Sequence, residues 1–196
     1  MALQRVFLVR HGDTKWTKTG QHTGRTDLPL TTEGENQGRL LRERLGEIDF
    51  ALVLSSPLQR AKETCRLADL LSRAEVSEDL HEWDYGTYEG LTTNQIRGLR
   101  PDWALWTDGA PDGETADQIS GRADRVLERV RRAEGNVALF SHGHMLRVLG
   151  ARWVGLPATA GRGLLLSTAS VSVLGYEREE RVITLWNGRA HLSQLA

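Results

Sequence analysis

Three short apolar runs are each followed at once by polar or charged residues, and this repeated arrangement constrains the fold more than any other feature of the chain. Residues 6–9 (VFLV) lead into RHG, residues 51–54 (ALVL) into SSPLQR, and residues 137–140 (VALF) into SHGH. Short apolar runs bounded by charge or glycine are typical of buried strands. Open α/β sheets bind ligands just beyond the carboxyl ends of such strands. We therefore expect two arginines and two histidines to lie together at one edge of a sheet: Arg10, Arg60, His11 and His142.

The strand-like runs alternate with segments of helical periodicity, which predicts a parallel sheet covered by helices on both faces. With 196 residues, 39% of them hydrophobic, the chain is long enough for one well-buried core and short for two. Two later runs, residues 170–173 and 182–185, are expected to form neighbouring strands. The sequence thus predicts a single α/β domain over residues 1–196, a three-layer α/β/α sandwich with a mostly parallel central sheet.

Capping patterns predict where three of the helices begin. In a capping box the side chain of a serine or threonine accepts a hydrogen bond from a backbone amide of the first turn. Three segments fit this pattern, beginning at Thr32, Ser56 and Thr115, and Pro57 supports the second because proline suits a first helical position. Between residues 82 and 113 the periodicity fails. We expect this segment to leave the regular sandwich and to run beside the ligand-binding edge, with short helices at most.

The composition argues against several classes of partner. The 25 basic and 26 acidic side chains give a formal net charge of −1, so no overall field favours nucleic acid or a membrane surface. No apolar stretch is long enough to span a membrane, and the N-terminus lacks the apolar segment of a secretory signal, so we expect a cytoplasmic protein. Cys65 is the single cysteine, which excludes an internal disulfide and a cysteine-rich metal site. Its apolar helix face favours a packing role.

The residues expected at the sheet edge suit phosphoryl transfer. A histidine such as His11 can attack phosphorus through one ring nitrogen if a hydrogen bond to the other fixes its tautomer. Gly12 lets the backbone turn sharply and approach both the ring and a phosphate. Arg10 and Arg60 supply planar, forked donors that match phosphoryl oxygens, and His142 completes the cationic cluster. Each residue alone has an ordinary structural interpretation, but their coincidence behind three strands favours a phosphate site.

The motifs as a set resemble those of the histidine phosphatase superfamily, which includes the cofactor-dependent phosphoglycerate mutases. The resemblance spans most of the chain and rests on residues 8–12 (LVRHG), 23–24 (TG), 27–31 (DLPLT), 33–34 (EG), 55–64 (SSPLQRAKET), 82–90 (EWDYGTYEG), 113–115 (GET) and 141–143 (SHG). It implies a phosphoglycerate mutase-like fold.

By this resemblance His11 is the residue phosphorylated during turnover, and Arg10, Arg60 and His142 hold the phosphate. Glu82 is the proton shuttle. As an acid it protonates the leaving oxygen, and as a base it then activates water against phosphohistidine. No metal ion and no cofactor are expected, because arginine and histidine stabilise the charge that magnesium stabilises in other phosphoryl-transfer enzymes.

A finer resemblance, to the fungal sedoheptulose-1,7-bisphosphatase subgroup, predicts the substrate contacts. It rests on residues 21–31, 82–90, 106–109, 113–115 and 143–147. Members of that subgroup hydrolyse sugar bisphosphates, so a small phosphorylated metabolite is the expected partner. The substrate-binding residues would be Thr17, Thr23, Gly24, Tyr85, Gly143 and Arg147. Arg147 is either a cation for a second phosphate or an ordinary surface residue. The chain departs from the pattern at Thr17, commonly asparagine in the family, and at Arg25, apolar in the subgroup.

Three other functions remain as alternatives. Mutases of the family follow the shuttle glutamate with an arginine and place a lysine eleven residues after it, and both cations bind the substrate's carboxylate. Here those positions hold Trp83 and Thr93, and Asp84 adds a negative charge, so we favour a phosphatase. A non-catalytic phosphate-binding module is disfavoured because both His11 and Glu82 are present. Phosphohistidine-protein phosphatase activity is the third alternative. The motifs leave the oligomeric state undetermined.

Three aromatic residues of the irregular segment, Tyr88, Trp103 and Trp106, have two interpretations. They form a lid over a sugar, since aromatic faces cover carbohydrate rings well, or they pack as a small core of their own. We favour the second slightly.

Overall fold

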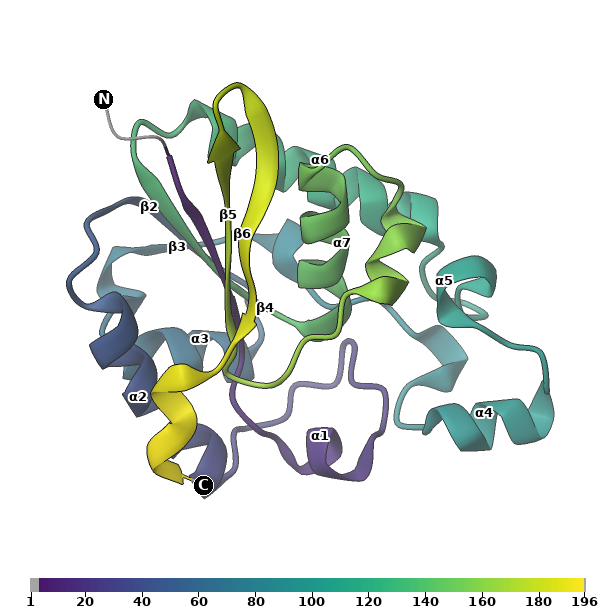
Figure 1. The fold of residues 1–196 in the computed structure, drawn as a ribbon. Coiled ribbons are helices and arrows are strands. Elements are labelled where there is room, and N and C mark those ends of the chain that lie inside the picture. Colours follow the sequence, from purple (N-terminus) through teal and green to yellow (C-terminus); the bar gives the residue numbers. More distant parts are fainter. Residues whose placement is uncertain (1–3, 196) are drawn as a thin grey trace.

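The computed structural model describes residues 4–195, which form a six-stranded sheet with helices on both faces (Figure 1). The strands are β1 (Val6–Arg10), β2 (Phe50–Ser55), β3 (Ala74–Val76), β4 (Asn136–Ser141), β5 (Val171–Glu177) and β6 (Glu180–Gly188). Their order in the sheet is β3-β2-β4-β1-β5-β6. The first four in the chain are mutually parallel, whereas β5 pairs antiparallel with β1 and β6 antiparallel with β5. The mostly parallel sheet and the neighbouring final strands agree with the sequence prediction.

The α-helices are α1 (Lys15–Thr19), α2 (Thr32–Leu45), α3 (Gln59–Leu67), α4 (Thr93–Leu99), α5 (Leu105–Asp108), α6 (Ala116–Arg132) and α7 (Gly143–Trp153). Short 3₁₀ helices lie between them at η1 (Leu71–Arg73), η2 (Glu78–Leu80), η3 (Gly86–Tyr88), η4 (Ala158–Gly163) and η5 (Ala190–Leu195). Within the described residues no helix is both long and apolar enough to cross a membrane.

Alternating side chains of β1 divide the core between the two faces of the sheet. Val6 and Leu8 pack in a cluster with buried residues of α6 and α7. Phe7 and Val9 pack in a second cluster with buried residues of α2 and α3. Cys65 of α3 is fully buried in this second cluster, and burial raises the pKa of its thiol to about 12. The packing role predicted for Cys65 is therefore confirmed.

Two of the three predicted helix starts need little or no revision. Thr115 caps α6 in a capping box, as the sequence predicts. The cap of α2 lies one residue earlier than predicted, because Thr31 rather than Thr32 accepts the hydrogen bond from the Gly34 amide (3.1 Å).

The capping box predicted at Ser56 is wrong. The N-cap of α3 is Leu58, which makes no side-chain capping bond, and Pro57 lies before the helix. The Ser56 hydroxyl does accept a hydrogen bond from the Leu58 amide at 3.3 Å, but it also lies 2.7 Å from Nε2 of His142. Ser56 thus supports the site at the sheet edge rather than the first turn of the helix.

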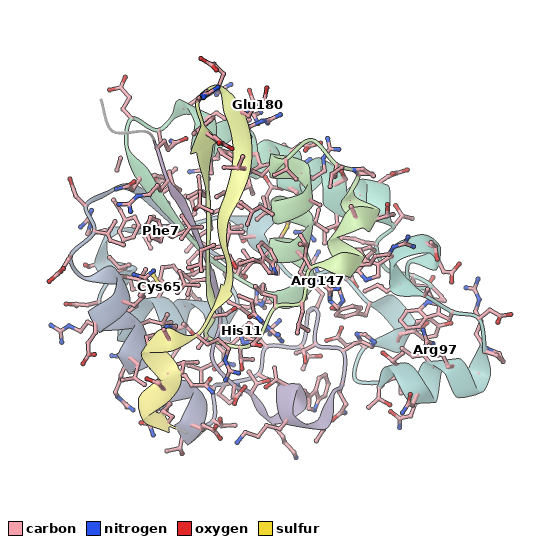
Figure 2. All side chains as sticks on the ribbon, viewed as in Figure 1. Phe7, His11, Cys65, Arg97, Arg147 and Glu180 are labelled. Atoms are coloured by element: carbon pink, nitrogen blue, oxygen red, sulfur yellow. The ribbon has the colours of Figure 1, made fainter. Side chains whose placement is uncertain are left out.

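The parallel strands bring the three predicted motifs to one edge. Arg10 at the end of β1 pairs with Ser141 at the end of β4, and Ser55 at the end of β2 pairs with Phe140 of β4. The chain segments that follow these strands therefore leave the sheet side by side. Figure 2 labels His11 near the lower ends of the strands and Arg147 beside α7; both side chains line one cavity.

The segment between η2 and α6 departs from the regular sandwich, as predicted. It carries η3, α4 and α5, all short. Trp103 is 2% exposed and belongs to the core cluster of α6 and α7, and Tyr88 and Trp106 pack against that cluster. The three aromatic residues form part of the main core, so they are neither a separate small core nor a lid.

Candidate active site

His11 is held in the orientation that a nucleophile needs. It follows β1 directly and is 4% exposed. Its Nδ1 lies 2.7 Å from the Gly12 carbonyl. Because a carbonyl only accepts, Nδ1 carries the proton and Nε2 keeps its lone pair. Burial, followed by the charges of Arg60 and Arg10, lowers the pKa of His11 well below its ordinary value, so the ring is neutral at neutral pH.

Gly12 permits a close approach that no other residue allows. A Cβ built on Gly12 would lie 2.3 Å from the carbonyl oxygen of Gly34 in the first turn of α2. The Gly12 amide donates to the Thr64 hydroxyl of α3 at 3.0 Å. Two helices thus fix the backbone that orients the His11 ring.

Arg60 lies in the first turn of α3 and is completely buried. Its guanidinium donates to the carbonyls of Thr23, Gly24 and Thr26, and its Nε donates to Nδ1 of His142 at 3.1 Å. Most of its donors are therefore engaged within the protein. In this structure Arg60 acts on the site through its charge, and direct contact with a phosphate stays a prediction.

His142 is the N-cap of α7 and is also fully buried. Since its Nδ1 accepts from Arg60, its Nε2 carries the proton and donates to the Ser56 hydroxyl. The ring centroid lies 5.2 Å from that of His11. Burial and then the Arg60 charge lower the pKa of His142 well below its ordinary value. His142, which the sequence predicts to be a cation, is thus a neutral ring in this structure.

Arg10 has an unused donor beside the nucleophile. One Nη donates to the Leu166 carbonyl at 2.5 Å. Its Nε is buried and has no hydrogen-bond partner among residues 4–195. A Cβ built on Gly143 would lie 3.4 Å from the Arg10 Cζ and 3.6 Å from Oε2 of Glu82. A buried unpaired donor costs free energy, and an acceptor brought by a ligand would offset that cost.

Glu82 approaches the same space from the loop after η2. Its Oε1 accepts from the amides of Trp83, His144 and Met145 at 2.9–3.1 Å, and its Oε2 also accepts from His144. The amides of His144 and Met145 belong to the first turn of α7, where unpaired amides favour an anion. Helix α7 therefore holds the carboxylate next to Arg10.

These groups surround a cavity of about 200 Å³. Of the predicted site residues, those that line it are Arg10, His11, Thr17, Thr23, Glu82, Tyr85, Gly143 and Arg147. Arg60 and His142 lie buried behind this lining, and Gly24 contributes the carbonyl that accepts from Arg60. The Thr17 hydroxyl is engaged with Thr14 in the capping box of α1.

Several lining residues were absent from the predicted site: Trp16, Gly20, Gln21, His22, His144 and Leu166. His22 and His144 both fall inside motifs, so their positions gave a signal. Trp16 and Leu166 come from segments with no motif, and nothing in the sequence indicated them.

One wall of the cavity is polar but uncharged. The Tyr85 hydroxyl lies 2.7 Å from Nδ1 of His144, and the ring of His22 lies 4.7 Å from that of Tyr85. Burial lowers the pKa of His22 to about 4 and that of His144 well below its ordinary value, while it raises the pKa of Tyr85. We call His22, Tyr85 and His144 the neutral wall.

Arg147 lines the cavity beside the neutral wall, one turn of α7 beyond His144. Its Nε donates to the Gly161 carbonyl at 3.0 Å and one Nη to the Arg162 carbonyl at 3.1 Å, both near the end of η4. Its Cζ lies 4.6 Å from the ring centroid of Trp106. Arg147 is therefore a fixed part of the cavity rather than an ordinary surface residue.

Comparison with known families agrees with this geometry. The model of the histidine phosphatase superfamily (branch 1) matches residues 6–189. The chain belongs to this superfamily. A solved structure of an open reading frame of Mycobacterium tuberculosis superposes with a TM-score of 0.90 at 40% identity, covering 94% of this chain and 97% of the other. The fold is thus that of the phosphoglycerate mutase-like histidine phosphatases.

Curated relatives include enzymes named as phosphatases. An acid phosphatase of Mycobacterium tuberculosis is 41% identical, covering 98% of this chain and 96% of its own. The sedoheptulose 1,7-bisphosphatase of Saccharomyces cerevisiae is 40% identical over 78% of this chain and 68% of its own. A probable phosphoglycerate mutase of Enterobacter is 31% identical over 93% of this chain and 89% of its own. With such relatives the chain is an enzyme of the phosphoric monoester hydrolase class.

Proposed function

We propose that this enzyme hydrolyses a small phosphorylated sugar without a metal ion, through a phosphohistidine at His11. One observation carries the proposal. His11 presents a neutral, oriented imidazole to the same cavity as the Glu82 carboxylate and the Arg10 guanidinium, whose Nε has no partner among the described residues. These supply a nucleophile, a proton carrier and an anion-binding donor, which two-step hydrolysis of a phosphate ester requires.

The two steps use the same groups in turn. In the first, His11 Nε2 attacks phosphorus, the bond to the ester oxygen breaks, and Glu82 in its acid form gives that oxygen a proton. In the second, water attacks the phosphorus, the P–N bond breaks, and Glu82 takes a proton from the water. Arg10, together with the buried charge of Arg60, stabilises the negative charge on the equatorial oxygens during both steps.

The neutral wall supports a leaving group that carries hydroxyl groups, such as a sugar, rather than one that carries a carboxylate. Imidazole and phenol groups exchange hydrogen bonds with hydroxyl groups, whereas a buried carboxylate needs a cation. The neutral wall supplies no cation, and we assign the two arginines of the lining, Arg10 and Arg147, to phosphate. The name of the yeast sedoheptulose 1,7-bisphosphatase fits this substrate class.

A mutase is the second candidate, favoured by the relative named as a probable phosphoglycerate mutase. Against a mutase, the two positions at which the family's mutases carry cations hold Trp83 and Thr93. Trp83 is fully buried, and its indole N–H donates to the Glu114 carbonyl at 2.9 Å. Thr93 lies 3.3 Å from Nε2 of His22 and so supports the neutral wall. Asp84, which follows Trp83 in the chain, adds a negative charge and forms an ion pair with Arg25 at 3.2 Å.

A substrate panel tests the proposal. Phosphate release and product isomerisation are measured for sugar monophosphates, sugar bisphosphates, 3-phosphoglycerate and a phosphohistidine protein. We expect sugar phosphates to lose phosphate to water at the highest kcat/KM. Interconversion of 3- and 2-phosphoglycerate with little phosphate release contradicts the phosphatase assignment. Preferential dephosphorylation of the protein substrate contradicts the sugar assignment alone.

Arg147→Ala decides between a bisphosphate and a monophosphate. Two of its donor nitrogens are engaged by η4, which leaves the second Nη for a ligand. Loss of one charge-assisted hydrogen bond costs about 1.5–3 kcal/mol, or about 10- to 150-fold in binding. We expect the KM for a bisphosphate to rise by this factor and the KM for a monophosphate to rise much less. Equal losses for both substrates remove Arg147 from the phosphate-binding residues.

A further inference from the structure

The backbone that carries Glu82 has little regular structure of its own. Residues 81–85 lie between η2 and η3 and belong to no helix or strand. His81, Glu82 and Tyr85 are nevertheless buried. Buried backbone carbonyls need hydrogen-bond donors, and here no neighbouring strand provides them. The Asp84 and Tyr85 carbonyls accept from the backbone amides of Glu114 and Tyr88, so the carbonyls of His81 and Glu82 depend on side-chain donors.

Arg122 of α6 supplies these side-chain donors. It is only 9% exposed and lies in the middle of the helix. One Nη donates to the carbonyls of Asp79 and His81 at 2.8 and 2.9 Å, and the other to the carbonyl of Glu82 at 3.2 Å. A single guanidinium therefore holds one carbonyl of η2 and two of the loop, including that of the proposed proton carrier itself.

Glu114 fixes the orientation of this guanidinium. Its two carboxylate oxygens accept from Nε and Nη2 of Arg122, each at 2.7 Å. One of the same oxygens accepts from the Asp84 amide at 3.0 Å, and the Glu114 amide donates to the Asp84 carbonyl at 2.9 Å. The Arg122–Glu114 pair thus binds the loop on both sides of Glu82.

The carboxylate end of Glu82 is held separately by the first turn of α7. Glu82 is therefore fixed at its backbone by α6 and at its side chain by α7. General acid–base catalysis requires the proton donor within hydrogen-bond reach of the leaving oxygen, so a small shift of this backbone changes the rate strongly. Arg122 itself is not among the residues that line the cavity.

We propose that Arg122 is a positioning residue for the reaction, which acts by fixing the backbone of Glu82 through three carbonyls and the Glu114 carboxylate. The proposal rests on the proposed function, because it assigns Arg122 to the step in which Glu82 moves a proton. It gives Arg122 no contact with substrate.

Arg122→Lys is the informative substitution. Lysine keeps the positive charge beside Glu114, but a single ammonium lacks the forked geometry that reaches three carbonyls and two carboxylate oxygens together. Arg125 offers a matched control on the same helix. It contacts η2, just before the loop, through the Asp79 carboxylate at 2.6 Å, and its side chain is 59% exposed. Arg125→Lys is expected to change neither rate nor binding.

The experiment is a double-mutant cycle with Arg122→Lys, Glu82→Gln and both together. Single-turnover rates are measured with glycerol 3-phosphate, whose leaving group needs a proton, and p-nitrophenyl phosphate, whose leaving group does not. Vanadate inhibition reports anion binding, and circular dichroism reports folding. We expect Arg122→Lys to lower the single-turnover rate with glycerol 3-phosphate at least about tenfold. This is a part of the about 100-fold loss expected when a general acid is removed. It should lower the single-turnover rate with p-nitrophenyl phosphate far less, and should change the inhibition constant of vanadate by no more than about twofold.

In the Glu82→Gln background, Arg122→Lys should add no further loss, because the group it positions is gone. Equal losses in both backgrounds, or equal losses with both substrates, overturn the positioning role and leave Arg122 merely structural. If Arg122→Lys does not fold, Glu114→Gln replaces it in the same cycle, with a smaller loss in the same direction. A wild-type enzyme that hydrolyses neither ester contradicts the proposed function itself, whereas an active enzyme with additive losses contradicts only the role of Arg122.

Discussion

Arg10→Met is expected to weaken anion binding strongly while changing the stability of the empty protein little. The buried Nε of Arg10 has no partner among residues 4–195, so its burial already costs free energy in the unliganded state. Methionine keeps most of the apolar stem and removes that cost, at the loss of the hydrogen bond to the Leu166 carbonyl. These two effects oppose each other in the free energy of unfolding.

With phosphate bound the balance changes. An oxygen that accepts from Nε makes a charge-assisted hydrogen bond worth about 1.5–3 kcal/mol, and its loss weakens binding about 10- to 150-fold. Inorganic phosphate and vanadate are suitable probes. Their Kd is measured by calorimetry, and the free energy of unfolding by urea denaturation with and without phosphate, since a ligand at about 100 times its Kd stabilises by about 2.7 kcal/mol.

Arg125→Met serves as the control, because this exposed arginine lies on α6 and pairs with Asp79. The reasoning is refuted if Arg10→Met binds phosphate as tightly as the wild type. It is also refuted if Arg10→Met lowers the free energy of unfolding more without phosphate than with phosphate. Arg10 then stabilises the fold rather than the bound anion.

Three further predictions follow from the same geometry. Gly143→Ala should leave stability unchanged or raise it by up to about 1 kcal/mol, since its Cβ meets only ordinary contacts, but the methyl group beside Arg10 and Glu82 should lower kcat/KM and phosphate affinity. Burial lowers the pKa of His22 from 6.5 to about 4, so the unfolded chain binds its proton more readily and stability should fall as the pH falls through this range. The His22 share is up to about 3 kcal/mol, and urea denaturation of His22→Gln should show a flatter pH dependence. Activity should survive EDTA, because Arg10 and Arg60 supply the positive charge; a loss that magnesium or zinc restores contradicts this.

The sheet and the meeting of its three motifs could be predicted because their signals are local. Each strand is a short apolar run, and each motif follows its strand within a few residues. Parallel strands then bring the motifs together by geometry alone. This reasoning brings Arg10 and His11 together, whereas Glu82 was predicted from the family resemblance; all three line one cavity.

What the sequence did not show depends on contacts between distant segments. The donors of Arg60 are engaged by carbonyls more than thirty residues away, and nothing in the sequence indicates these bonds. Arg122 lies 40 residues from Glu82 and looks like one of several arginines of an amphipathic helix. The Ser56 side chain fits a capping box by spacing, but hydrogen bonding with His142 across the sheet edge competes with that role. Spacing along the chain carries no information on such contacts.

The measurement that tests the central claim most directly is the detection of a phosphorylated enzyme. The enzyme is mixed with a labelled sugar phosphate or p-nitrophenyl phosphate, quenched within one turnover, and analysed by peptide mass spectrometry at high pH, where phosphohistidine is stable. We predict acid-labile, base-stable phosphate on His11, present in Glu82→Gln and absent from folded His11→Ala, which should not turn over. A folded His11→Ala enzyme with near wild-type turnover, or phosphate trapped on any other residue, contradicts the account.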